Sequence, residues 1–148
     1  HAHHEDGDQH RDHRHADDGF AAVEAALLTG PTASALDAWE ALEAELLHHF
    51  LVEEEALFPA FEATTGMSSG PTEAMRLEHA QMRELFAPLA AAIEAEETES
   101  VRDLLETLLV MLQQHNMKEE NVLYPLCDQA LATAQREAIA RRLAATSP

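Results

Sequence analysis

Two histidine–glutamate pairs occur in the same local sequence context. The segments from His49 to Pro59 and from His115 to Pro125 both read His, three residues, Glu-Glu, two residues, Leu, an aromatic residue and Pro, with an offset of 66 between positions 49 and 115. Residues four apart in a helix lie one above the other on the same face, so each His and the first Glu after it can converge on one point. Imidazole and carboxylate ligands without thiolate suit iron, manganese or zinc. Each segment therefore predicts one half of a metal site.

The same offset extends to two further histidines. His13 falls on His79, and the residues around them agree in type. The matched positions are Asp12 with Glu78, Phe20 with Phe86, Val23 with Leu89 and Leu27 with Ile93. The chain is therefore predicted to contain two copies of one helical hairpin. Each copy contributes one His from its first helix, and one His and one Glu from its second.

The His–Glu spacing alone is weak, because glutamate is abundant and His1 and Glu5 show the same spacing. A lone His is more often a surface residue or a hydrogen-bonded core residue than a ligand. Here six residues agree in register, and Leu46 and Leu112 each precede a His on an apolar stripe that should face inward. Buried carboxylates without a cation are costly. The predicted metal ligands are His13, His49, Glu53, His79, His115 and Glu119.

Residues next to these ligands are expected to have supporting roles. We expect Glu54, Glu55 and Glu120 to be solvated or to support the ligands from outside. Phe58 and Tyr124 are expected to close the end of the bundle, where Tyr124 could hydrogen-bond a ligand. Acceptors for the imidazole N–H groups should exist, but the sequence does not name them.

Four long helical segments must position these ligands. Apolar residues recur at three and four positions, and clusters of Gly, Pro and Ser separate the segments. The predicted helices cover residues 8–29, 33–64, 72–96 and 100–131, with kinks at Pro59 and Pro125. Short loops make neighbouring helices antiparallel. The predicted fold is all-α, an up-down-up-down four-helix bundle built from two repeated helical hairpins, with a short C-terminal helix over residues 133–145. Residues 1–7 are predicted to be a disordered His-rich N-terminus, and residues 8–148 the domain.

The composition narrows the class of function. The formal net charge of −19 disfavours nucleic acid and anionic lipid as partners, and no apolar run approaches the roughly 20 residues of a membrane span. The visible N-terminus is polar and lacks the apolar stretch of a signal peptide. Cys127 is the only cysteine, which excludes a disulfide framework and fits a reducing cytoplasm. The oligomeric state is not indicated.

The segments His49 to Pro59 and His115 to Pro125, together with Glu78-His79, resemble the motifs of the hemerythrin-like, or HHE cation-binding, family. This resemblance implies a four-helix bundle with a non-haem di-iron centre at the six predicted ligands. Two half-sites suggest two ions, expected to be iron bridged by oxo or hydroxo, with zinc or manganese possible. Coordination positions would remain open for dioxygen, peroxide or nitric oxide. Family members bind or sense dioxygen, handle nitric oxide or peroxide, or store iron.

One departure from the family pattern bears on function. Oxygen-carrying hemerythrins have a further His one turn before the position of His79, where this chain has Met75. The matching place in the first copy is Gln9, with His10 beside it. Either one iron is more open, or His10 or a water fills the position. We therefore expect a protein that binds, senses or reduces a small oxidant. The alternative is an iron store, buffer or signalling module without turnover, and the sequence does not decide whether the chain is an enzyme.

Overall fold

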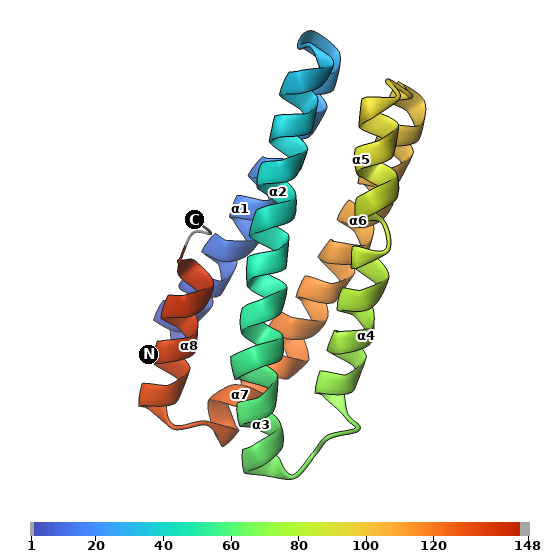
Figure 1. The fold of residues 1–148 in the computed structure, drawn as a ribbon. Helices are drawn as coiled ribbons and strands as arrows, with labels where there is room; N and C mark the ends of the chain where they lie inside the picture. Colours follow the sequence, from blue (N-terminus) through green and yellow to red (C-terminus); the bar gives the residue numbers. More distant parts are fainter. Residues whose placement is uncertain (1, 146–148) are drawn as a thin grey trace.

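In the computed structural model, described for residues 2–145 and for side chains from residue 16 to residue 145, four long helical arms run side by side (Figure 1). A short C-terminal helix packs outside them. The first arm is α1 (Ala2–Thr29), and the second joins α2 (Thr32–Val52), the π-helix η1 (Glu53–Leu57) and α3 (Phe58–Thr65). The third arm joins α4 (Pro71–Arg83) and α5 (Phe86–Glu94). The fourth arm joins α6 (Thr98–Lys118), the π-helix η2 (Glu119–Leu123) and α7 (Tyr124–Ala130). The short C-terminal helix is α8 (Thr133–Ala144).

The predicted all-α bundle of two hairpins is confirmed, and the described residues contain no strand. Helix boundaries agree within two residues except at the start, where α1 begins at Ala2 and not near Asp8. The division into an N-terminal segment, residues 1–7, and a domain stays a prediction. Short connections reverse the chain between arms, and Gly66 ends α3 with a positive φ of 73° that suits glycine.

The arms bury two apolar clusters, one toward each end of the bundle. The first includes the predicted stripe residues Leu42, Leu46, Leu108 and Leu112. The second gathers around η1, η2 and the two helices that follow them, and Phe58 and Tyr124 belong to it as expected. On the third and fourth arms, the buried His79, His115 and Glu119 lie between residues of the two clusters, and on the second arm Glu53 lies beside Val52, where the second cluster begins. The core therefore consists of two apolar parts with a polar layer at their junction.

The two π-helices occupy repeat-equivalent positions, just before the two prolines expected to kink the arms. The N–H of Phe58 bonds to the carbonyl of Glu53, and that of Tyr124 bonds to the carbonyl of Glu119, each five residues back. Proline has no N–H to donate and its ring clashes with the carbonyl four residues earlier, so a wider turn relieves the helix there. Each π-helix begins at a predicted glutamate ligand, and single π turns of this kind are frequent at functional sites.

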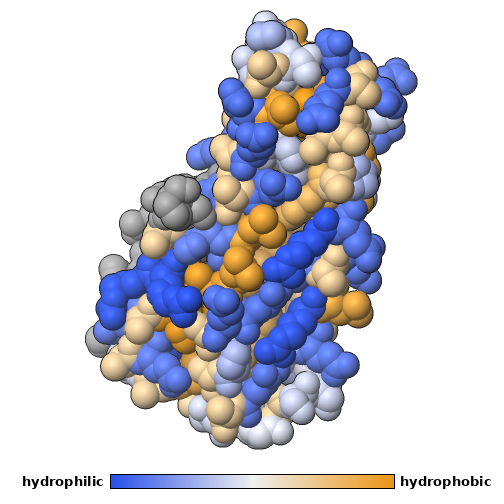
Figure 2. Space-filling view, viewed as in Figure 1, coloured by the Kyte–Doolittle hydropathy of each residue, from blue (hydrophilic) through white to orange (hydrophobic). Residues whose placement is uncertain are grey.

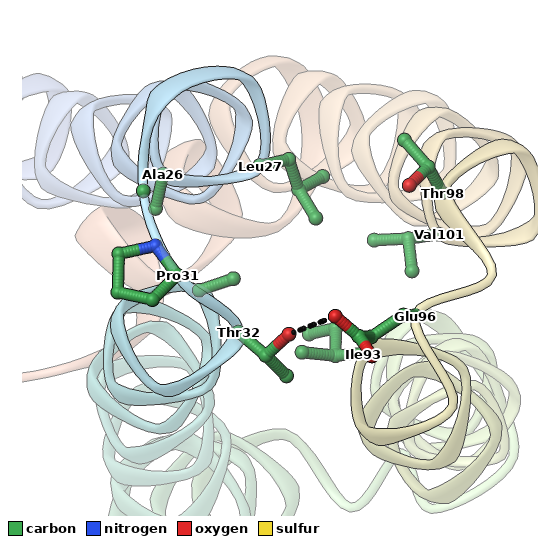
Figure 3. A pocket seen from close by; sticks show the side chains of 10 residues that line it. Ala26, Leu27, Pro31, Thr32, Ile93, Glu96, Thr98 and Val101 are labelled. Atoms are coloured by element: carbon green, nitrogen blue, oxygen red, sulfur yellow. Dashed lines mark hydrogen bonds between the residues drawn. The ribbon is translucent and has the colours of Figure 1, made fainter.

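A cavity of about 150 Å³ lies at the end of the bundle away from η1 and η2. In this cavity Leu27, Ile93 and Val101 point inward, and Thr32 donates a hydrogen bond to Glu96 (Figure 3). The face turned to the viewer in Figure 2 is mostly hydrophilic, with hydrophobic residues visible along its middle. Among the described residues, no helix has the length and apolar character needed to cross a bilayer.

Candidate metal centre

Four buried side chains from three of the arms converge on one point in the polar layer. They are Glu53 at the start of η1, His79 on α4, His115 on α6 and Glu119 at the start of η2. One potential ligand atom of each lies within 4.8 Å of the others. Two nitrogen and two oxygen donors this close together could hold a metal ion.

The Nε2 atoms of the two histidines face each other. They are 3.2 Å apart, and Nε2 of His79 lies 3.0 Å from Oε1 of Glu53. On the other side, Nε2 of His115 lies 3.1 Å from Oε2 of Glu119, its partner four residues on in sequence. The i, i+4 arrangement expected from the sequence is therefore present in the second hairpin.

His49 lies at the edge of this cluster. Its Nε2 atom is 3.4 Å from Oε2 of Glu53 and 3.9 Å from Oε1 of Glu119. Burial lowers the pKa of His49, but the two carboxylates outweigh burial and raise it well above its usual value. The structure thus brings five of the six predicted ligands together. The sixth, His13, belongs to α1, but its side chain lies outside the described residues, so its role stays a prediction.

A carboxylate outside the cluster orients the ring of His79. Its Nδ1 atom lies 2.7 Å from Oε2 of Glu54, and because a carboxylate only accepts, Nδ1 carries the proton. Arg83 donates two hydrogen bonds to Glu54, at 2.9 and 3.0 Å. Partial burial raises the pKa of Glu54, but Arg83 and His79 outweigh burial and hold that pKa below its usual value. In the neutral ring, Nε2 therefore points a lone pair into the cluster.

His115 is held in the same way by a different pair of residues. Its Nδ1 donates to Oε1 of Glu78 at 2.8 Å, and Lys118 donates to the other oxygen of Glu78. The repeat matches Glu78 with Asp12 but predicts no role for Glu78. For Glu54 the sequence leaves two roles open, solvation or support of the ligands, and the contact with His79 is the second of these. The contacts join helices far apart in sequence, so spacing could not identify them.

The charges of the cluster fit a cation. The inward Nε2 atoms of His79 and His115 lie within hydrogen-bonding distance of two buried carboxylates, and within the described part of the chain Oε1 of Glu53 has no hydrogen-bond donor in suitable geometry. Burial lowers the pKa of His115, but Glu119 and Glu53 raise it to about 9. The cluster therefore attracts positive charge strongly, and its nitrogen and oxygen donors are those that suit iron, manganese and zinc.

The model of one protein family, described as the hemerythrin HHE cation-binding domain, matches residues 5–127. The match spans all four arms and both copies of the His–Glu segment. The chain belongs to the hemerythrin HHE cation-binding family. The resemblance seen in the motifs is thereby confirmed, and the buried cluster is the candidate site for the cation of this HHE domain. Searches of curated proteins and of solved structures gave no match.

Tyr124 joins the two carboxylates of this HHE domain. Its hydroxyl lies 3.1 Å from Oε2 of Glu53 and 3.0 Å from Oε1 of Glu119, so its one proton is shared between them. Burial, together with the two carboxylates, raises the pKa of Tyr124 well above its usual value, which keeps the phenol protonated. The expectation that Tyr124 hydrogen-bonds a ligand position is met. Phe58, its equivalent in the repeat, has no hydroxyl, so the two halves of the site differ here.

Aromatic rings shield the HHE cluster on one side. The ring of Phe50 stacks on His79 with 4.1 Å between centroids, and Phe58 lies 5.6 Å from the same ring. Met75, at the place where oxygen carriers have a further His, is buried in the same apolar cluster as Phe58. Its effect on an open metal position stays a prediction, and the side chain of His10 lies outside the described residues.

Proposed function

We propose that this HHE domain holds two metal ions, iron in the cell, with zinc and manganese as other metals that suit the donors. The support is the convergence of two inward-facing imidazoles and two buried carboxylates, each histidine being oriented by a carboxylate outside the cluster. The remaining two proposed donors, His13 and His49, follow from the internal repeat, because they are equivalent to His79 and His115. The ligands are His13, His49, Glu53, His79, His115 and Glu119.

Iron in this position would supply a redox-active centre for dioxygen, peroxide or nitric oxide, which the domain binds, senses or reduces. The chain's own residues select for small uncharged molecules. Phe50 and Phe58 cover the ring of His79, and Met75 adds to the apolar wall, which disfavours bulk water and anions. Tyr124 holds a proton at its phenolic oxygen between the two carboxylates.

Iron storage or buffering without turnover is a second candidate. The formal net charge of −19 supports it, because an acidic surface raises the local concentration of cations. Steady consumption of peroxide or nitric oxide by the iron-loaded chain would exclude pure storage. Stoichiometric iron uptake and release without consumption would support it.

We also propose that the protein works in the cytoplasm. Cys127 is a free, buried thiol, as expected for a protein of the reducing cytoplasm. The acidic surface argues against nucleic acid as a partner.

Metal content and the absorption spectrum before and after reduction test the proposal. We expect more than one iron per chain and near-ultraviolet absorption that reduction removes. H115A should lose metal, whereas Q114A, at the exposed neighbouring position, should keep it. One zinc per chain without any spectral response to oxidant, or full metal content in H115A, would contradict the proposal.

A further inference from the structure

Each copy of the repeat carries two adjacent glutamates, four and five residues after the histidine of its second helix. They are Glu53 and Glu54 in the first copy, and Glu119 and Glu120 in the second. Three of these four residues have contacts that account for them. Glu53 and Glu119 line the buried cluster, and Glu54 accepts from Nδ1 of His79 at 2.7 Å. Glu120 is the remaining member of the two doublets.

The contact of Glu54 joins the two hairpins. Glu54 lies on η1 in the first hairpin, whereas His79 lies on α4, the first element of the second hairpin. A glutamate of one copy therefore orients a histidine that the other copy contributes. When two equivalent units face each other, a contact from the first to the second has a reciprocal contact from the second to the first. The offset of 66 assigns Glu120 and His13 to that reciprocal contact.

The backbone places Glu120 as it places Glu54. Each is the second residue of a π-helix that begins at a glutamate of the cluster. The dihedral angles of that first residue agree, with φ −62° and ψ −47° at Glu53, and φ −61° and ψ −50° at Glu119. Because side-chain direction follows the backbone, the two second glutamates leave their helices in equivalent directions.

The surroundings of Glu120 also fit a role beside the cluster. Glu120 is half-buried, as Glu54 is, and it is engaged in a polar or electrostatic contact. Glu55, the next residue after the first doublet, is exposed. In addition, α1 packs against α6, and η2 continues α6. A histidine on α1 therefore belongs to a helix that lies beside the arm of Glu120.

The repeat carries the carboxylate and the imidazole but not the cation behind them. Arg83 donates two hydrogen bonds to Glu54. The equivalent of Arg83 in the first copy is Asp17, whose carboxylate has no proton to donate. The hydrogen bond that orients a ring needs only an N–H donor and an acceptor, and both copies supply these two groups.

We propose that Glu120 is the positioning residue for His13, accepting from its Nδ1 and leaving the lone pair of Nε2 for the metal. The inference rests on the proposed function, which counts His13 among the ligands. A neutral imidazole has one N–H and one lone pair, so an acceptor at Nδ1 fixes Nε2 as the ligand atom. The first glutamate of each doublet then serves the cluster directly. The second holds the first-helix histidine of the other copy.

Chelator competition with cobalt(II) as the added metal tests this role in the full chain. We expect two ions per unsubstituted chain, and in E120Q an affinity for one of them that is about 10–100-fold weaker, the effect typical of a residue that orients a ligand. E106Q is the matched control, because Glu106 is exposed on α6 of the same arm and the substitution removes the same charge. Both affinities of E106Q should stay within about twofold of the unsubstituted chain.

A double substitution separates positioning from a general loss of stability. H13Q should lose tight binding of one ion. Adding E120Q to H13Q should change the remaining affinity by less than about twofold, because the group that Glu120 positions is then absent.

Proton NMR of the cobalt-loaded chain gives a second readout. The unpaired electrons of cobalt(II) shift the ring N–H signals of bound histidines away from the other signals, and a carboxylate acceptor slows exchange of that proton with water. In E120Q one such signal should exchange faster, and it should be the signal that H13Q removes. E54Q should affect a different signal, that of His79.

The outcomes distinguish this inference from the proposed function. Two ions in the unsubstituted chain and one in H13Q, with unchanged affinities in E120Q, would overturn the positioning role and leave the proposed centre intact. Loss of one ion in E120Q even at saturating cobalt would make Glu120 a ligand and would also overturn it. Two tightly bound ions in H13Q would contradict His13 as a ligand, and with it both proposals.

Discussion

Replacing Tyr124 by Phe removes one hydroxyl from between two buried carboxylates and leaves the ring in place. The hydroxyl lies 3.1 Å from an oxygen of Glu53 and 3.0 Å from an oxygen of Glu119. Phe is the residue that the repeat itself has at the equivalent position, Phe58, so an apolar ring is compatible with this part of the core. The variant therefore isolates the hydrogen bonds from the packing.

The size of the effect follows from the charge of the acceptors. A hydrogen bond to a charged group contributes about 1.5–3 kcal/mol, and the substitution removes the phenolic donor from two buried carboxylates. For a domain of about 150 residues, each kcal/mol shifts Tm by about 2–4 °C. In the metal-free chain Y124F should lower Tm by about 3–12 °C. In the metal-loaded chain the decrease in Tm should be smaller, because the cation neutralises the charge of both carboxylates.

Thermal unfolding followed by circular dichroism, with and without chelator, measures both values. M75L is the matched control, since Met75 is buried in the same apolar cluster and the exchange conserves volume. An unchanged Tm of metal-free Y124F would refute the role of Tyr124. A decrease that is larger with metal than without it would refute the idea that a cation neutralises Glu53 and Glu119.

Other residues give further tests. E54Q should weaken metal binding by about 10–100-fold in chelator competition, as for other residues that orient a ligand, whereas E55Q, an exposed neighbour, should not; equal affinities would contradict the orienting role. Burial raises the pKa of Cys127 to about 12, so the thiol should resist a disulfide reagent at pH 8 until the chain unfolds, and rapid reaction in the folded chain would contradict its burial. Arg76 donates hydrogen bonds to Glu62 and holds the pKa of Glu62 below its usual value. The stability from this pair is present at neutral pH and lost as pH falls through the folded pKa of Glu62, so R76M should be less stable at pH 7, and the difference in urea midpoint should shrink below about pH 4.

Local periodicity made the arms and the second His–Glu pair predictable. His115 and Glu119 lie four residues apart on one helix face, and that spacing survives folding, with Nε2 of His115 3.1 Å from Oε2 of Glu119. The repeat likewise placed His79 in the cluster, because its register was carried by the residues around it. What is encoded within one or two turns of helix could be read directly from the sequence.

Contacts between arms could not be read in this way. The bond from His79 to Glu54 joins residues 25 positions apart, and its geometry depends on how α4 packs on η1. The prolines indicated a break in the helix, but the choice of a π turn at Glu53 and Glu119 depends on where the surrounding core places those carboxylates. The packing of α8 on the first hairpin, where His48 donates a hydrogen bond to the carbonyl of Arg142, also depends on the tertiary fold.

The most direct test of the metal centre is a crystal of the iron-loaded chain measured on both sides of the iron absorption edge. Two anomalous peaks should lie among His49, Glu53, His79, His115 and Glu119, with His13 completing the second ion's ligands. Peaks only near the N-terminal histidines His1, His3 and His4, or no peak within the buried cluster, would contradict the account.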